Sequence, residues 1–570
     1  MFLKRNQTTI AGKRYQSVLL VQGKRVPGKR GPGRPSAQAQ PPKSVVVHET
    51  LANLSRLPED LIGLIESYCK GKSELTSDPV NSGAKTSPPQ AVHLGPCYGL
   101  LAALHALAWE LGIVQAVGQA RRVERLALYL IYARIFHQGS RLSAARCSED
   151  HAVREVLNVG RFDEDDLYEA LEYLEQHQRR IEDQLRARAK AGSGEAVFLY
   201  DLTSHYFEGQ YNELAEYGYP RDIKKGKKQL VAGLLTDGEG EPISLELYRG
   251  NTADTPTFLD AVEKIKVRFG AREVAVVGDR GMIKRMGKQA LGEANFRYVS
   301  ALTDPQIRAL LQKGVLQLGL FEDKPAEVEA NGKRYVLRCN PQTQARERSR
   351  REDKWKKVRA KIQARNEAVE KSSKKQEQSS LRQAQGLIKK YRLSKWVSVR
   401  LEGRKVVWSE DAAARQQEEQ LDGCYVVESD LPQAVASTQQ VHDRYLDLTK
   451  VERDFRTLKT GLLQLRPIFL RKEERTRGHG LVAMLALKLA REIDRRVAPL
   501  GLTVADAVER LSGVNLVCLG DPAMGFWRLA DSYPAAQAEV LGVFPKIPAP
   551  LLYLKKSNRN RLRNPRKGRS

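Results

Sequence analysis

The stretch that decides the fold is FLYDLTSHYFEG, residues 198–209. Its apolar start is typical of a buried β-strand, and Asp201 comes at the end of that apolar run. A carboxylate in such a place is costly to desolvate unless it is paired, hydrogen-bonded or bound to a cation. The simplest alternative is that Asp201 begins a turn or caps a helix. A functional Asp201 therefore requires a partner elsewhere in the chain.

The best candidate partner is Asp279, in REVAVVGDRGMI at residues 272–283. Asp279 ends a second apolar strand, so two neighbouring strands would bring both carboxylates to one edge of a sheet. Their mutual repulsion would be relieved by a cation, and hard oxygen ligands of this kind suit Mg²⁺. Two such ions about 3.5 to 4 Å apart would fit phosphoryl transfer chemistry.

The segments between and after these carboxylates predict a mixed sheet with helices. Residues 227–250, KKQLVAGLLTDGEGEPISLELYRG, hold two β runs joined at TDGEGEP, which indicates a hairpin. Residues 255–270 follow a helical pattern, and FRYVSAL at 296–302 is a further strand candidate. We expect an α/β core in which chemistry gathers at the strand ends.

Bulk composition limits the class of protein. A chain of 570 residues is long enough for several domains, and its formal net charge of +27 indicates a polyanionic partner. We find no run of 18 apolar residues and no signal peptide, so we expect no membrane association and a cytoplasmic, nucleoid-associated protein. The six cysteines form no CxxC pair, so a zinc site is not expected, and the absence of a phosphate-binding loop argues against ATP-driven chemistry.

Composition shifts divide the chain into seven segments. We expect a basic N-terminal arm with short β pieces (1–48), a helical region that could bind DNA (49–190), the first part of the core (191–304), an insertion of β pieces and basic helices (305–440), the second part of the core (441–500), a C-terminal helical region (501–554) and a disordered basic tail (555–570). The arm carries Pro-Gly-Arg-Pro at 32–35, where Arg34 is a weak candidate for a minor-groove contact; a basic linker is the alternative.

The insertion carries a concentrated basic run. Residues 346–375 hold 13 Lys or Arg against five acids, so this segment either grips DNA or is a solvated helix face. Trp396 and Trp408 could stack on a displaced base, although both lie in strand-like runs where core packing is the simpler explanation. His205 could approach the carboxylates, and a surface or sheet-facing histidine is the simpler interpretation.

A third acid lies on the amphipathic segment 445–467, YLDLTKVERDFRTLKTGLLQLRP. Tyr445, Glu452 and Lys459 are seven residues apart, which places them along one face of a continuous helix. Arg456 shares that side because it follows Glu452 by four residues. Plain ion pairing along the helix is the alternative to a site.

The chain carries three blocks in a fixed order: YDLTSHYFEG, VVGDRGMI and YLDLTKVERDFRTLK. Together they resemble the DDE transposases of bacterial insertion sequences, in the group with a Tyr-Arg-Glu-Lys signature. The resemblance extends from about residue 95 to 495. It implies a ribonuclease H-like core, interrupted by an insertion between its second Asp and its Glu. The intervals of 78 and 173 residues between the three acids agree with that organisation.

The resemblance also implies site residues. Asp201, Asp279 and Glu452 would be catalytic and would hold two Mg²⁺ ions, for which Mn²⁺ is expected to substitute. Tyr445 and Lys459 match the signature and would contact DNA, whereas the signature arginine is replaced by Leu448. We expect Arg456 to take the place of that arginine, with Arg453 as the weaker choice.

The function implied is metal-dependent cleavage at transposon ends followed by strand transfer into target DNA. Its partners would be double-stranded terminal inverted repeats and target DNA, bound by a homodimer or higher oligomer. Two alternatives stay open: a DNA-binding descendant that has lost catalysis, and a ribonuclease H-like nuclease without strand transfer.

Overall fold

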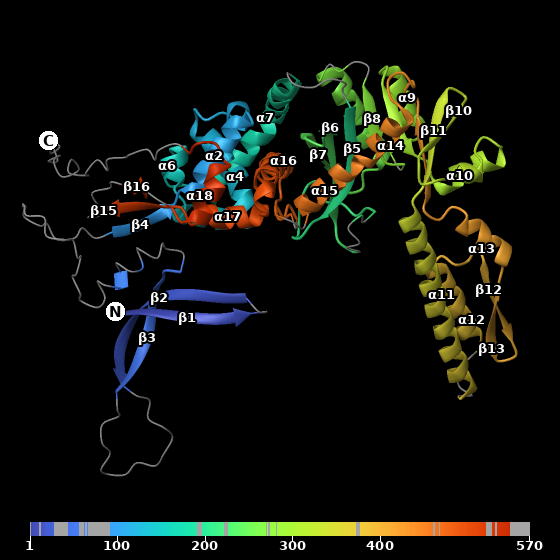
Figure 1. Cartoon of the computed structure of the whole chain (residues 1–570), viewed down its shortest axis with the longest axis horizontal. Helices are drawn as coiled ribbons and strands as arrows, with labels where there is room; N and C mark the ends of the chain where they lie inside the picture. The colour runs from blue at the N-terminus through green and yellow to red at the C-terminus, as the bar shows by residue number, and fades with distance from the viewer. Residues whose placement is uncertain are drawn as a thin grey trace, which may run out of the picture. The chain divides into compact units, whose positions relative to one another are not determined.

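The computed structural model describes residues 2–10, 13–27, 44–55, 62, 65–66, 92–190, 197–219, 221, 226–269, 271, 274–280, 282–371, 377–459, 462–466, 468–519, 527–530 and 533–547. The chain divides into two compact units, Met1–Ala170 with Leu489–Ser570, and Leu171–Lys488 (Figure 1). The division falls inside two long helices, α7 (Glu164–Lys190) and α16 (Glu473–Val497).

The unit 171–488 is built on one eight-stranded sheet with the order β10-β11-β14-β9-β8-β5-β6-β7. Its strands are β5 (Val197–Tyr206), β6 (Gln229–Asp237), β7 (Pro242–Arg249), β8 (Ala275–Gly278), β9 (Arg297–Ala301), β10 (Ala326–Ala330), β11 (Lys333–Cys339) and β14 (Cys424–Ser429). β5, β6 and β7 are antiparallel neighbours, whereas β8 and β9 run parallel to β5. Three antiparallel strands followed by two parallel ones, in this order, are the ribonuclease H-like arrangement, so the expected mixed α/β core is confirmed.

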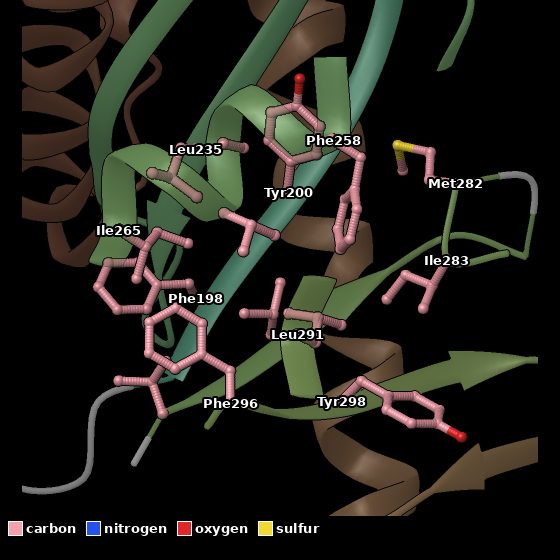
Figure 2. Close-up of a cluster of buried hydrophobic side chains, with 14 of the residues drawn as sticks. Phe198, Tyr200, Leu235, Phe258, Ile265, Met282, Ile283, Leu291, Phe296 and Tyr298 are labelled. Atoms are coloured by element: carbon pink, nitrogen blue, oxygen red, sulfur yellow. The ribbon is translucent and has the colours of Figure 1, made fainter. Parts of the chain in front are cut away.

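One face of the sheet is covered by α8 (Asp254–Glu263) and α9 (Arg285–Glu293). Figure 2 shows the buried cluster between them, in which Phe198 and Tyr200 of β5 meet Phe258 and Leu291 of the two helices. Successive strand residues point to opposite faces, so residues 198, 200 and 202 fill this core while residues 201, 203 and 205 face the other side. The side chain of Asp201 therefore lies on the face of the sheet opposite this cluster.

The hairpin expected at TDGEGEP is present between β6 and β7. Asp237 accepts hydrogen bonds from the backbone N–H groups of Glu239 and Glu241, at 3.0 and 2.9 Å. Gly240 has φ 79°, a left-handed conformation that a glycine adopts without the Cβ strain other residues would suffer. The turn fixes the register of β6 against β7.

The interval 305–440 is only partly separate from the core. Two of its β pieces, β11 and β14, pair with each other, and β14 pairs with β9, so they extend the core sheet. The part that projects from this sheet holds α11 (Pro341–Glu370), α12 (Glu377–Lys390), the hairpin of β12 (Val397–Glu402) and β13 (Lys405–Glu410), and α13 (Ala412–Glu419). α11, α12 and β12 lie side by side (Figure 1) around a core of their own, centred on Trp355. α10 (Asp304–Gln312) precedes this part.

The segment expected to be one continuous helix is two helices, α14 (Thr438–Leu446) and α15 (Leu448–Lys459). Asp447 separates them with φ −60° and ψ −19°, which keeps a helical backbone but ends the hydrogen-bond ladder of α14. The prediction that Tyr445 shares a helix face with Glu452 is therefore wrong, and the two side chains come from different helices.

The other unit combines helices with two small sheets. Its elements are β1 (Phe2–Ile10), β2 (Lys13–Pro27), β3 (Ser44–Asn53), β4 (Val92–Cys97), α2 (Gly99–Glu110), α3 (Ile113–Val117), α4 (Arg122–Phe136), α5 (Arg141–Cys147), α6 (Val153–Leu157), α17 (Val504–Ser512), β15 (Asn515–Leu519), β16 (Trp527–Leu529) and α18 (Ala535–Gly542). β1, β2 and β3 form an antiparallel sheet, and β3 crosses the expected boundary at residue 48. The helical C-terminal region thus includes two strands, which form a sheet with β4. No helix in the described part of the chain has the length and apolar character needed to span a bilayer.

Candidate active site

Asp201 and Asp279 lie on adjacent strands. β5 and β8 are parallel neighbours, and their register pairs Tyr200 with Gly278, so the residues that follow, Asp201 and Asp279, occupy neighbouring positions. Asp201 is inside β5 rather than in a turn, which contradicts the simpler interpretation of this residue. Asp279 follows the last residue of β8 and is exposed. The edge at which the two carboxylates meet is therefore set by the end of β8.

Glu452 reaches this edge because α15 packs along the face of β5 that carries Asp201. The charge of Glu452 acts on Asp201, and the charge of Lys459 acts on His205. The step from Glu452 to Lys459 along α15 is about 10 Å, and the step from Asp201 to His205 along β5 is about 13 Å. Because the first residues of the two pairs interact with each other and so do the second, α15 and β5 run alongside each other in the same direction. This parallel course brings the beginning of α15 to the carboxylates and its end to His205.

The charges of Asp279 and Glu452 both act on Asp201. Burial raises the pKa of Asp201 to about 7, and the neighbouring carboxylates of Asp279 and Glu452 add to that increase. The N–H of Leu202, which donates to Asp201 at 2.8 Å, and the charge of Arg221 act in the opposite direction. Such a carboxyl group is poorly stabilised as an anion unless a cation is bound beside it.

The side chain of Tyr445 belongs to the same cluster although it comes from α14. Burial raises the pKa of Tyr445 to about 12, and the charges of Asp279 and Glu452 contribute to the increase. The hydroxyl therefore keeps its proton at neutral pH and can donate a hydrogen bond. The structure thus brings together Asp201, Asp279, Glu452 and Tyr445.

The donor set fits a hard divalent cation by type. Carboxylate oxygens are the ligands that Mg²⁺ takes in proteins, and this edge of the sheet offers Asp201 and Asp279, with Glu452 on the helix packed against β5. As they stand, however, no three His, Cys, Asp or Glu side chains among the described residues are grouped closely enough to hold a metal ion. Asp279 and Glu452 are exposed. A bound cation would therefore require these two side chains to move toward Asp201.

The expected DNA contacts differ in their surroundings. Arg453 and Arg456 are exposed on α15, whereas Lys459 is half-buried near His205. Leu448, which stands at the position of the signature arginine, is buried in the first turn of α15 with 7% of its surface exposed. A guanidinium could not replace Leu448 without displacing this packing, so a cation at this site has to come from a neighbouring position.

The weaker candidates are placed as follows. Trp396 is 4% exposed and packs edge to face against Trp355, and Trp408 packs against the same ring. Trp355 donates through its indole N–H to Glu410 at 2.8 Å. The tryptophans therefore form the core of the insertion. Arg34 lies outside the described residues.

Sequence reasoning missed two cations next to the carboxylates. Arg280 follows Asp279 and acts electrostatically on Tyr445, and the charge of Arg221 acts on Asp201. The signal for Arg280 was its adjacency to Asp279 in the sequence. Arg221 had no such signal, because it reaches the site through a long connection between β5 and β6 and pairs there with Asp254.

His205 is the least expected feature of the site. It is fully buried on β5, and neither ring nitrogen has a hydrogen-bond partner among the described residues. Burial lowers the pKa of His205 to about 3, and the charges of Lys459 and Arg466 contribute to the decrease. The imidazole is therefore neutral. Of the two simpler interpretations, a surface histidine is wrong, whereas a histidine of the sheet agrees with its place in β5.

Replacing this imidazole should stabilise the protein. We expect His205→Leu to raise the free energy of unfolding by about 1 to 2 kcal/mol at neutral pH, because a buried unpaired polar group is removed. The gain should grow as pH falls from about 6.5, since the unfolded imidazole takes up a proton that the folded one cannot. Urea unfolding followed by circular dichroism at about pH 7.5 and about pH 5 measures both effects. A less stable variant would instead mean that the imidazole makes a polar contact.

Comparison with known proteins addresses the family directly. Residues 192–489 match the family described as Transposase DDE domain, and this match covers more than half of the chain. Among solved structures, the piggyBac transposase synaptic complex with hairpin DNA is 10% identical over 72% of this chain and 76% of that chain, with a TM-score of 0.36. The Mos1 strand transfer complex is 12% identical over 42% of this chain and 66% of that chain, with a TM-score of 0.14. No curated protein matches the chain.

The matched interval contains β5, β8 and α15, the elements that carry Asp201, Asp279 and Glu452. It begins just before β5 and ends within α16, so it also includes the whole of the insertion. The chain therefore belongs to the Transposase DDE domain family.

Proposed function

We propose that the protein is a DNA transposase of the insertion-sequence type, which cuts DNA at the ends of its element and joins those ends to a target duplex. The observation that carries this proposal is the placement of Asp201 and Asp279 at neighbouring positions of β5 and β8, with α15, which carries Glu452, packed against β5. The family and the formal charge of +27 support it, because the substrate would be a polyanion.

The proposed roles follow from position. Asp201, Asp279 and Glu452 would hold two Mg²⁺ ions, which when bound polarise the phosphodiester and lower the pKa of the attacking water. The protonated hydroxyl of Tyr445 lies beside two of these acids and would donate to a phosphate oxygen of the DNA end. Lys459 and Arg456 would contact phosphates of the same strand, the latter in place of the signature arginine.

The reaction needs no covalent bond to the protein. Water would displace the 3′ oxygen at the end of the element, and the freed 3′ hydroxyl would then attack a phosphodiester of the target at the same carboxylates. The chain contributes position and charge: it orients the scissile phosphate and gathers the negative carboxylates that make the site specific for cations. Pairing of two ends would require two or more copies of the chain.

A second candidate function is a DNA-binding descendant without catalysis. Two observations favour it: Leu448 replaces the signature arginine and is packed in place, and the three carboxylates are not grouped as metal ligands within the described residues. This protein would still bind terminal repeats through its basic surfaces, but it would not cut them.

The test is a cleavage and joining assay. Purified protein is incubated with Mg²⁺, a labelled duplex taken from inverted repeats that flank the coding sequence, and a second unlabelled duplex. The proposal expects cutting at the repeat boundary and a joined product, both abolished by EDTA. Binding without cutting in either Mg²⁺ or Mn²⁺ would favour the catalytically lapsed descendant. Cutting without joining would favour a nuclease.

A further inference from the structure

A cationic cavity of about 380 Å³ lies next to the candidate active site, between the beginning of α9, the end of β9, α10 and the beginning of β11. Among the residues that line it, five carry a positive charge: Arg280, Lys284, Arg285, Lys288 and Lys333. The first of these directly follows Asp279, so the cavity begins where the cluster of carboxylates ends. No acidic side chain of the described residues lines the cavity.

Two of these lysines are fixed by one buried carboxylate. Glu428 on β14 accepts from the ammonium groups of Lys288 and Lys333, at 2.7 and 2.8 Å, and also from the hydroxyl of Tyr298. Lys288 in addition lies over the ring of Tyr298, 4.9 Å from its centroid. One carboxylate cannot neutralise two ammonium groups, and each ammonium has three N–H donors. Glu428 thus holds a net positive charge in place at the wall of the cavity.

The remaining cations are less neutralised. In the described part of the chain, Arg280 has a single acid within reach, Asp304, at 4.0 Å. Lys284 and Arg285 are exposed, and no hydrogen bond or ion pair within the described residues joins either side chain to another group. They also begin α9, which has no acid in its first turn, so its N-terminal N–H groups add to the positive potential. A built arrangement of fixed and free cations of this kind is suited to a polyanion.

We propose that this cavity binds backbone phosphates of a second DNA duplex, the one to which the cut end is joined. The proposal rests on the proposed function. The candidate contacts for the transposon end, Lys459 and Arg456, lie on α15, which packs against β5. The cavity begins at Arg280 and lies beyond β8 in the sheet, at the ends of β9 and β11. Cations on both sides of one set of carboxylates allow two DNA segments to meet there, which joining requires and simple hydrolysis does not.

The experiment compares two double variants of the full chain. Lys284→Gln with Arg285→Gln removes the two unpaired cations of the cavity. Lys313→Gln with Lys324→Gln removes the same charge from two exposed lysines that do not line it. Each protein is loaded with a terminal-repeat duplex without metal, and the binding of a second, unrelated duplex is measured at several salt concentrations. Joining is measured separately with Mg²⁺.

The cavity variant is expected to bind the second duplex about tenfold more weakly. The slope of log affinity against log salt should fall by about two, because each of the two substitutions removes one cation that would neutralise a phosphate. Its binding of the terminal repeat should fall less, and the Lys313/Lys324 variant should keep the slope. An unchanged slope would overturn the proposal, and this includes the case of a cavity that binds only inorganic phosphate. An equal loss of affinity for both duplexes would overturn it as well. Failure of the natural protein to cut or join DNA would refute the proposed function, while the binding comparison would still test the cavity.

Discussion

In a cleavage assay with Mg²⁺, the Asp201→Asn protein is expected to cut a terminal-repeat duplex at least about 1000-fold more slowly than the natural protein. The charges of Asp279 and Glu452 both raise the pKa of Asp201. Removing its charge while keeping its shape takes away a metal ligand without creating a cavity. The rates are measured from single-turnover cleavage with protein in excess over DNA, so that substrate binding does not limit them.

DNA binding should survive this substitution. Asp201 is one acid in a chain of formal charge +27, and it is half-buried, so its loss does not weaken the attraction to phosphates. A mobility-shift titration without metal measures that affinity. The matched control is Glu263→Gln, which removes an exposed carboxylate from α8 and should leave the cleavage rate unchanged. If Asp201→Asn still cuts within tenfold of the natural rate, Asp201 is not a ligand; if it loses DNA binding as well, its role is structural.

The parts of the core that can be predicted depend on local patterns. The hairpin between β6 and β7 follows from a turn sequence whose glycine takes the left-handed conformation, and Asp279 follows from an apolar strand that stops at a polar residue. The sequence predicts Asp201 at the end of a strand, yet β5 continues to Tyr206. The difference arises because residues 202–205 are buried by α15 and by the opposite core, and this burial depends on contacts far apart in the sequence.

The break between α14 and α15 leaves no mark in the sequence. Tyr445, Glu452 and Lys459 keep helical spacing through it, and Asp447 is neither glycine nor proline. The backbone at Asp447 stays in the helical region, so the break reflects how each helix packs rather than a local preference. The cluster still forms, since Tyr445 approaches Asp279 and Glu452 from its own helix.

The basic composition of the insertion predicts its presence but not its attachment to the core. β11 and β14 pair across an interval of about 85 residues, and the pairing of strands so far apart leaves no periodic pattern in the sequence. The burial of His205 is hidden from the sequence for a similar reason. This residue alternates normally in its strand, and only α15 decides that its face is closed to water.

The second large effect concerns metal removal and pH. Without metal, the natural protein is expected to lose stability relative to Asp201→Asn as pH rises from about 4 to about 7, because the carboxyl group of Asp201 has a pKa of about 7 in the folded chain and an ordinary value of 3.8 when unfolded. The comparison with Asp201→Asn cancels the opposite pH dependence of His205, which both proteins share. Between these two values the carboxyl group of Asp201 holds a proton in the folded state that it has lost in the unfolded state, so its contribution to the free energy of unfolding falls with rising pH. The loss for this group alone amounts to at most about 4 kcal/mol.

Mg²⁺ should reverse this loss. A cation binds the ionised carboxylates and offsets their repulsion, so its stabilising effect should be small at about pH 5 and large at about pH 8. Thermal unfolding in EDTA and in Mg²⁺ at both pH values measures the difference. Asp201→Asn should lack the pH-dependent effect of Mg²⁺, and in EDTA at about pH 8 it should unfold at a higher temperature than the natural protein. Glu263→Gln, again the control, should behave as the natural protein does.

The opposite result would identify a different partner for Asp201. If the metal-free natural protein were instead more stable than Asp201→Asn at about pH 8, the anion of Asp201 would be stabilised within the chain itself. Arg221 is the cation in position to do so, since its charge already lowers the pKa of Asp201 while burial and the other two acids raise it. A double-mutant cycle of Asp201→Asn and Arg221→Gln separates the two cases, because it cancels the loss of the ion pair between Arg221 and Asp254. A favourable coupling energy between Asp201 and Arg221 would assign the anion to Arg221. In that case, a metal ion at this edge of the sheet would not act by relieving the mutual repulsion of the three carboxylates.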